Sequence, residues 1–345
     1  MSATPPLLSP DDTRYLKGIA ILLMLAHHLF GFPERILPPA ELIPLSRHWA
    51  LEVQFGIFAK ICVPMFMFLA GYGFSRRANI SAGYVFDKLG RLFGTYWFYF
   101  ALFIPVGMAF FPDVRDASGI GQRFSTDPVT ILANLFAISD SYNNEWWFLQ
   151  TYALLLIALP AIARLGRQPW LLMLLSVAAA LAPLVVVPAS GLPRFDIGSR
   201  QFLIWQFPFV LGFLFERMIG KQATAWRHPL FILPALAATL LLVKFLGLYG
   251  GILATPIFAA LCLTARTVFP ALSQPFMRLG DHSLPMWLIH TFFCYYFFQG
   301  LVFLPRYSIA VFIVFVAMTY GSAYGLERLR LGLLSCVRPA TRHAA

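Results

Sequence analysis

Apolar segments separated by short polar loops follow one another along most of the chain. A helix of about 17 to 25 mostly apolar residues is long enough to cross a bilayer. Ten segments fit, at 14–32, 51–75, 89–111, 146–165, 169–188, 201–219, 229–248, 250–265, 284–304 and 307–327. The eighth is short and fits a re-entrant helix as well as a full span, and the still shorter segment 128–139 suits a helix at the membrane interface. We therefore expect an all-α, polytopic integral membrane protein.

The charges in the loops predict how the spans are oriented. Cytoplasmic loops of membrane proteins carry an excess of Lys and Arg. With the N-terminus inside, the inner loops hold 17 basic residues and the outer loops hold 7. We expect both termini to be cytoplasmic, with residues 1–13 as a disordered leader, 14–330 as the transmembrane domain and 331–345 as a cytoplasmic tail.

Composition agrees with a membrane protein and excludes several other classes. Residues are 59% hydrophobic and only 12% charged, against about 25% charged in soluble domains. The net charge of +11 is spread over many short loops, so we expect no nucleic-acid partner. The cysteines show no metal or disulfide spacing, and no metal site is expected. Without a phosphate-binding loop or a His-Glu-x-x-His motif, an ATP-driven pump and a zinc protease are disfavoured.

The first apolar segment carries ionisable residues on one face. Lys17 and His28 are eleven residues apart, which is three helical turns plus roughly 20°, or about 16 Å along the axis. Ionisable side chains in a bilayer are costly and normally face a protein interior or a watery cavity. His28 is suited to act as a general base at neutral pH. A lysine that extends to the interface and a structural histidine also explain these residues, although the second explanation fits the adjacent pair His27 and His28 less readily.

Two further residues are candidates for catalysis or proton relay. Lys60 lies within the second span, and His290 follows Leu288-Ile289 in a late span. A histidine that packs between helices explains His290 equally well.

A short cytoplasmic loop between the second and third spans is strongly basic. It is flanked by Arg76, Arg77, Lys88 and Arg91. Arginine holds phosphate groups through two parallel hydrogen bonds, so this loop predicts a phosphate-binding site. Ordinary retention of positive charge on the inner side gives the same pattern.

Polar and aromatic residues meet at the outer start of the fourth span. Glu145 precedes Trp146 and Trp147 there. Tryptophan is common at membrane interfaces, but carbohydrates also stack on its ring, and Glu145 adds hydrogen-bond acceptors that suit a polyol. We predict these three residues as a binding site for an acceptor substrate.

Together these stretches resemble the acyltransferase-3 family of integral membrane acyltransferases. The resemblance begins with the basic-x10-His pattern from Lys17 to His28 and the Phe-rich stretch 63–72. It continues with Arg91-Leu92 before Tyr96-Trp97, with Trp147-Phe148-Leu149, and with Leu279-Gly280-Asp281-His282-Ser283 before Trp287-Leu288-Ile289-His290. The similarity covers about residues 14 to 330. Lys17 stands where Arg is commoner in the family, Ala70 replaces a common Ser, and Gly94-Thr95 stand where prolines are usual.

The resemblance implies transfer of an acyl group from a cytoplasmic donor to a hydroxyl on the outer side, usually of a sugar in a bacterial surface glycan. Lys17 and His28 match the family's essential pair, Arg91 its cytoplasmic basic site and His290 a late motif. We accordingly expect an O-acetyltransferase of the bacterial inner (cytoplasmic) membrane, surrounded by membrane lipids. Acyl-CoA, most simply acetyl-CoA, is the expected co-substrate, with no bound cofactor, and a glycan or its lipid-linked precursor is the expected acceptor.

A transporter is the alternative from another class. A secondary transporter or flippase for a glycan precursor would use the intramembrane Lys and His as a proton relay. The absence of detectable inverted halves in the sequence counts against it.

Overall fold

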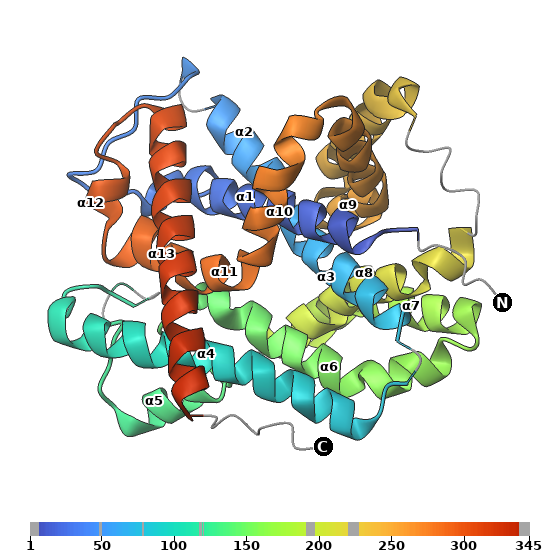
Figure 1. The fold of residues 1–345 in the computed structure, drawn as a ribbon, viewed down its shortest axis with the longest axis horizontal. Coiled ribbons are helices and arrows are strands. Elements are labelled where there is room, and N and C mark those ends of the chain that lie inside the picture. The colour runs from blue at the N-terminus through green and yellow to red at the C-terminus, as the bar shows by residue number, and fades with distance from the viewer. Residues whose placement is uncertain are drawn as a thin grey trace, which may run out of the picture.

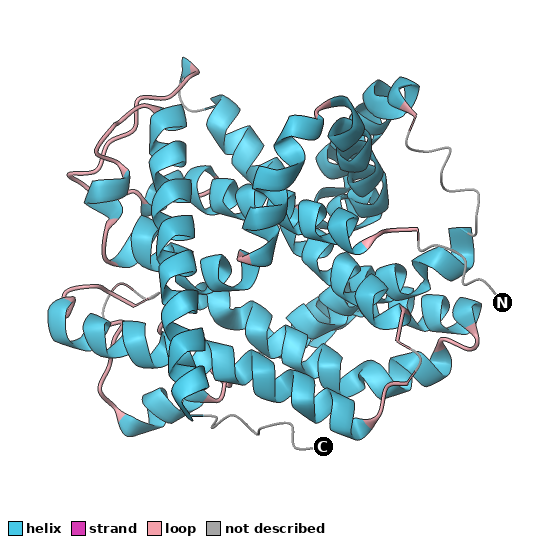
Figure 2. Ribbon diagram, viewed as in Figure 1, coloured by secondary structure: helices cyan, strands magenta, loops and turns pink. Residues whose placement is uncertain are grey.

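The computed structural model is a bundle of helices joined by loops (Figures 1 and 2). It describes residues 7–47, 50–77, 79–116, 119, 121–190, 197–219 and 228–337. The parts of the predicted leader at 1–6 and of the predicted tail at 338–345 lie outside these ranges. The helices are α1 (Pro10–Phe30), α2 (Ala50–Ala59), α3 (Cys62–Ser75), α4 (Ala82–Phe110), α5 (Pro128–Leu135), α6 (Trp147–Leu165), α7 (Pro169–Ser190), α8 (Ile197–Ile219), α9 (Ile232–Val268), α10 (Ser273–Asp281), α11 (Ser283–Thr291), α12 (Gln299–Val302) and α13 (Ser308–Val337).

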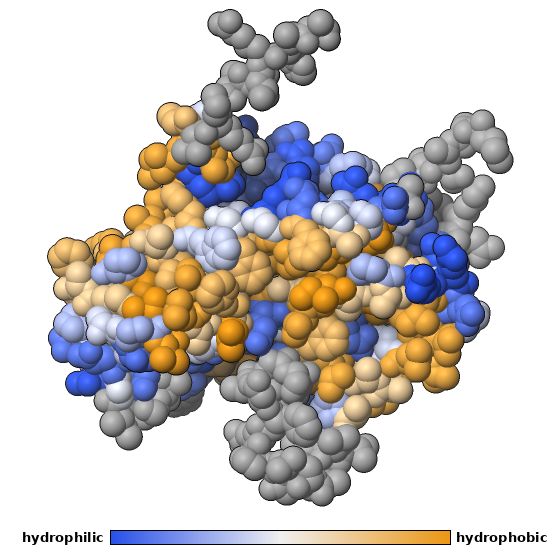
Figure 3. All heavy atoms as spheres, turned by 90° about the horizontal axis from the view of Figure 1, so that it is seen from below, coloured by the Kyte–Doolittle hydropathy of each residue, from blue (hydrophilic) through white to orange (hydrophobic). Residues whose placement is uncertain are grey.

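Six helical segments in the described ranges are long and apolar enough to cross a membrane. They are Ala50–Ser75, Ala82–Phe110, Asn144–Leu165, Gln201–Ile219, Pro229–Val268 and Ser308–Cys336, and Pro169–Leu184 is a shorter apolar helix. Figure 3 shows apolar residues spread across the middle of one face, with hydrophilic residues along its upper edge. The chain is therefore a multi-pass membrane protein. The count of ten spans and the orientation of the termini remain predictions.

Helix α1 lies at the centre of the fold and packs against α2, α3, α10 and α11. It begins at Pro10, before the predicted span start at residue 14, because Ser9 caps it. The Ser9 hydroxyl accepts a hydrogen bond from the backbone N–H of Asp12, and the Asp12 carboxylate accepts one from Ser9. This reciprocal arrangement satisfies two backbone donors at the helix start.

Two glycines let α10 approach α1 closely. A Cβ atom at Gly18 would lie 1.8 Å from the carbonyl oxygen of Phe276, and one at Gly280 would lie 1.9 Å from that of Arg14. Only glycine fits at both positions, so the two backbones are in direct contact where α10 leads into α11.

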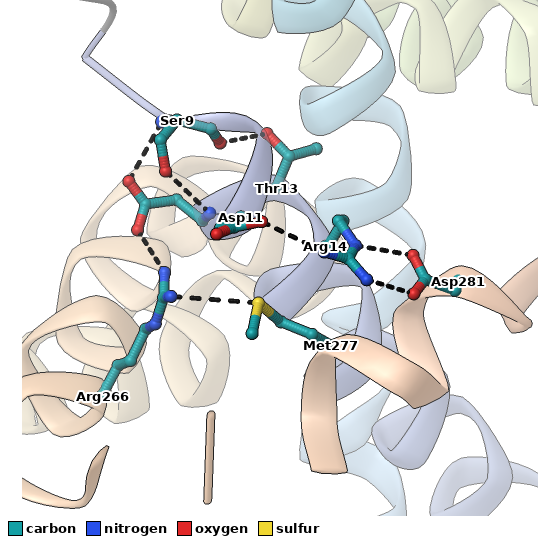
Figure 4. Close-up of polar contacts among 8 residues, drawn as sticks. Ser9, Asp11, Thr13, Arg14, Arg266, Met277 and Asp281 are labelled. Carbon is teal, nitrogen blue, oxygen red and sulfur yellow. Dashed lines mark hydrogen bonds and ion pairs between the residues drawn. The ribbon is translucent and has the colours of Figure 1, made fainter. Parts of the chain in front are cut away.

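Ion pairs reinforce this contact at the first turns of α1 (Figure 4). The Arg14 guanidinium donates two hydrogen bonds to the Asp281 carboxylate, with Nε 2.7 Å from Oδ1. Arg266 at the end of α9 donates to Asp12 over 2.7 Å. Hydrogen bonds from Arg14 lower the pKa of the Asp281 carboxyl below its ordinary value. The start of α1 is thus fastened to α9 and α10.

Two predicted spans are interrupted in the structure. The span at 51–75 is divided by a turn at Lys60 and Ile61 into α2 and α3. The span at 284–304 is α11, a wide π turn at Phe292–Tyr296, and α12. Helix α9 covers the two predicted spans 229–248 and 250–265, and its kink at Gly247 falls at their predicted boundary. Gly247 has φ of +53°, a conformation that glycine adopts most readily, and the chain folds back there so that Gly250 approaches Leu242. Hydrophobicity indicates the apolar lengths, but it does not indicate the interruptions within a predicted span.

The chain ends and the short apolar segment also differ in detail from their predicted limits. Helix α13 continues to Val337, seven residues into the predicted tail that starts at 331. The segment 128–139 contains only the short helix α5, whose first turn is capped by the Asp127 side chain accepting from Thr130.

Candidate active site

A cavity of about 260 Å³ lies between α1, α3, α4, α6 and α11. Lys17, Met24 and His28 of α1 all line it, which confirms that Lys17 and His28 share one face. The other lining residues are Val63, Phe66, Ala70, Leu92, Glu145, Trp147, Phe148, Leu149, Tyr152, Ser283, Leu284 and Trp287.

The walls of this cavity are mainly apolar and aromatic, and polar side chains stand at its ends. Lys17 lies toward the start of α1, and His28 with Glu145 lies toward its end. Lys17 has no ion-pair partner among the residues that the structure describes. Within the described part of the chain, a cation that forms no ion pair therefore faces the cavity about 16 Å along the helix from His28.

His28 is joined to a carboxylate and an arginine. Its Nε2 lies 3.5 Å from Oε2 of Glu145, and Oε1 of Glu145 accepts a hydrogen bond from Arg35 over 3.0 Å. The Glu145 side chain is 13% exposed and that of His28 8%. The three residues come from α1, from the 3-10 turn Pro33–Arg35 and from the 3-10 turn Asn144–Trp146. A carboxylate this close to a histidine can stabilise the imidazolium that forms when the histidine accepts a proton.

Tyr295, from the π turn, contacts both the backbone and the imidazole of His28. Its hydroxyl donates to the backbone carbonyl of His28 and lies 3.4 Å from His28 Nδ1. In the tautomer that carries its proton on Nδ1, His28 donates to the Tyr295 oxygen and has its lone pair on Nε2, beside Glu145 and the cavity.

His290 packs directly against His28. The centres of the two rings are 4.8 Å apart, and His290 is fully buried. Its Nδ1 lies 2.7 Å from the carbonyl oxygen of Trp287, while Nε2 has no hydrogen-bond partner in the described structure. His290 does not line the cavity, so its predicted role in relay would act through His28.

His27 and Lys60 are placed away from the cavity. His27 Nδ1 lies 2.7 Å from the carbonyl oxygen of Gly56, which joins α1 to α2 where Gly31 and Gly56 come into contact. Lys60 is exposed at the turn between α2 and α3. Neither residue is among those that line the cavity, and their predicted roles stay untested.

The predicted phosphate-binding residues gather where α3 ends and α4 begins, outside the cavity lining. Arg76 pairs with Glu216 over 2.7 Å, and Arg91 pairs with Asp87 over 2.9 Å. The cationic groups of Arg77 and Lys88 each lie 5.6 Å from the ring centre of Tyr84. Two of the four charges are therefore already balanced by acids in this structure.

The two adjacent tryptophans have different surroundings. Trp147 lines the cavity and stacks on Trp205, with ring centres 5.9 Å apart. Trp146 is 2% exposed, and its indole N–H donates to the carbonyl of Leu288. Only Trp147 and Glu145 of the predicted acceptor site face the cavity.

Sequence reasoning missed Arg35 and Tyr295. In the sequence, Arg35 is simply one of the outer basic residues, and Tyr295 lies in an aromatic run that reads as ordinary membrane-span composition. Nothing in their spacing indicates that Tyr295 contacts His28 or that Arg35 contacts Glu145.

The geometry can be compared with known proteins. A family model described as an acyltransferase domain matches residues 12–328, nearly the whole chain. Comparisons with curated proteins and with solved structures gave no match. The family match includes the helix that carries Lys17 and His28, the residues around Glu145 and the helix that carries His290. The chain belongs to the acyltransferase-3 family of membrane acyltransferases.

Proposed function

We propose that this protein is an O-acyltransferase that moves an acyl group, acetyl in the simplest case, from cytoplasmic acyl-CoA to a hydroxyl of an extracytoplasmic glycan or its lipid-linked precursor. The observation that carries the proposal is the single cavity that joins Lys17 to His28 and Glu145. It supplies a cationic end, an apolar passage and a base with its carboxylate partner. The bacterial inner membrane is the proposed location.

The donor would enter from the end marked by Lys17. The phosphates of acyl-CoA would pair with Lys17, which forms no ion pair with any described residue. Arg77 and Lys88, where α3 ends and α4 begins, offer further cations. The narrow thioester arm suits walls formed by Phe66, Trp147 and Phe148. In this arrangement Trp147 serves the donor passage rather than the acceptor.

His28 would act as the general base. Nε2 takes the proton from the acceptor hydroxyl while the hydroxyl oxygen attacks the thioester carbonyl. The new C–O bond forms, the C–S bond breaks, and the proton passes from His28 to the departing thiolate to give free CoA thiol. The Glu145 carboxylate, 3.5 Å from Nε2, stabilises the imidazolium that exists between these two proton transfers.

Mass spectrometry of surface glycans tests the proposal. Glycans are compared between cells with the gene, cells without it, and cells complemented with His28→Ala. His228→Ala is the matched control, because His228 is exposed in a loop before α9. We expect the mass increment of one acetyl group to disappear in the deletion and in His28→Ala, and to remain in His228→Ala.

Two results would contradict this function. An acetyl increment that survives in His28→Ala, with the protein inserted normally, removes His28 from the chemistry. Loss of the whole polymer, rather than of its decoration, indicates transport of the precursor instead of acylation.

A further inference from the structure

Arg35 contacts the site without lining the cavity. It lies five residues beyond the end of α1, and Nη1 donates to Glu145 Oε1 over 3.0 Å. The guanidinium carbon lies 4.2 Å from the ring centre of Phe32 and 5.1 Å from that of Tyr295. Arg35 thus reaches the same carboxylate as His28 and the same tyrosine as His28.

The backbone that follows the Arg35 Cα atom is held by one side chain. Gln299 Nε2 donates to the carbonyl oxygen of Arg35 over 2.8 Å, and Gln299 Oε1 accepts from the N–H of Leu37 over 3.0 Å. Gln299 also donates to the carbonyl of Cys294, next to Tyr295. The turn that carries Arg35 and the π turn that carries Tyr295 are therefore fixed to each other.

The charges around His28 show what Arg35 contributes. The titratable and charged groups that face it or lie nearby are His27, Arg35, Lys60, Glu145, His290 and Tyr295. Glu145 is the only carboxylate among them. If Glu145 had no other partner, its buried negative charge would favour a protonated His28. A protonated imidazole cannot accept the hydroxyl proton.

We propose that Arg35 is a positioning residue, which aims the Glu145 carboxylate at His28 and balances its charge so that His28 rests as a neutral base. This inference rests on the proposed role of His28. Oε1 is held by Arg35, which turns Oε2 toward Nε2. The carboxylate can then stabilise the imidazolium formed during transfer without holding a proton on His28 beforehand.

The sign of the effect follows from these charges. Removal of the Arg35 cation takes away a positive charge near His28 and leaves Glu145 uncompensated. Both changes favour protonation of His28, so a higher pH is needed to obtain the neutral base. Lysine at this position keeps the charge but not the planar geometry of the guanidinium.

The test is the pH dependence of transfer of labelled acetyl groups from acetyl-CoA to glycan in membranes that contain the full-length protein. Arg35→Gln and Arg35→Lys are compared with Arg306→Gln as a control. Arg306 also pairs with a glutamate, but it is 64% exposed, and its distance of 3.8 Å from the exposed Glu41 makes the ion pair weak. In Arg35→Gln we expect kcat to be about tenfold lower at neutral pH and to recover partly at alkaline pH, because the acid limb of the pH–rate profile shifts upward by about one pH unit. The KM for acetyl-CoA should stay within about twofold of wild type. Arg35→Lys should keep the wild-type acid limb.

Other results would overturn the inference. An unchanged pH profile in Arg35→Gln shows that Arg35 does not act through His28. An equal loss of rate at every pH, with a lower melting temperature, assigns it a purely structural role. His28→Ala separates this inference from the proposed function, because full activity in that variant rejects the base itself, whatever Arg35 does.

Discussion

Replacement of Gly280 by alanine should disturb the site from a distance. Gly280 lies in α10, where its missing side chain leaves room for the backbone of α1. A Cβ there would be 1.9 Å from the Arg14 carbonyl oxygen and 2.9 Å from its carbon. These are backbone atoms of a helix, so neither can rotate away as a flexible side chain would.

The size of the required movement follows from these distances. Cβ contacts shorter than 3.0 Å are essentially never seen, so α10 and α1 must separate by at least about 1.1 Å. Overpacking of this kind typically costs about 1 to 3 kcal/mol. Helix α11 continues directly from α10 and carries Ser283, Trp287 and His290. A displacement of about 1 Å in such a constellation can lower a rate on the order of 100-fold.

Acetyl transfer and thermal unfolding of the purified protein measure the two parts of this prediction. We expect Gly280→Ala to lower kcat by about 100-fold and to lower the melting temperature. Gly321→Ala is the matched control, since Gly321 lies in α13 and a Cβ atom there would have no neighbour within 4 Å, and it should behave as wild type. If Gly280→Ala matched Gly321→Ala in both measurements, direct backbone contact between α1 and α10 would be refuted.

Four further predictions follow from the site and its supports. Lys17→Met should raise the KM for acetyl-CoA about tenfold or more, because a charge-assisted contact is worth about 1.5 to 3 kcal/mol. Lys17→Arg should retain binding of the donor, and equal KM values in the two variants would exclude a contact between Lys17 and the phosphates. Glu145→Gln should lower kcat about 100-fold with little change in KM, because the His28 imidazolium loses its negatively charged partner. A wild-type kcat in this variant would remove Glu145 from the mechanism. Arg91→Ala should weaken use of the donor more than of the acceptor, measured as separate KM values, and an unchanged donor KM would argue against it. Hydrogen bonds from Arg14 lower the pKa of Asp281, so this link stabilises the fold at pH values above the ordinary pKa of a carboxyl group and is lost as the pH falls through the lowered pKa. The acid-induced drop in melting temperature should therefore be smaller in Asp281→Asn than in wild type. An identical drop in both proteins would contradict this.

The sequence predicts the helical class because the signal for it is local. Apolar length alone marks a span, and all six long apolar helices overlap predicted segments. The breaks are not predictable in the same way. Lys60 and Ile61 interrupt a continuous apolar stretch, and the π turn at Phe292–Tyr296 consists of residues that are equally at home in a straight helix. These breaks depend on packing between segments far apart in the chain.

The candidate site shows the same division between local and distant information. Lys17 and His28 belong to one helix, so their spacing suffices to place them on one face. Glu145 is 117 residues from His28, and its neighbours Trp146 and Trp147 favour a role with the acceptor. Its position beside His28 depends on how the loop between α5 and α6 returns to α1. No local pattern at Arg35 carries that information.

The uninterrupted course of α1 has a consequence for substrate length. Lys17 and His28 are fixed to one rigid rod, whereas the helices at 50–75 and 283–302 that surround them are broken. The interval of about 16 Å between cation and imidazole therefore stays constant when the neighbouring segments shift. In the proposed function, this fixed interval would select donors by length, because a reactive carbonyl nearer to or farther from the anionic group would not reach His28.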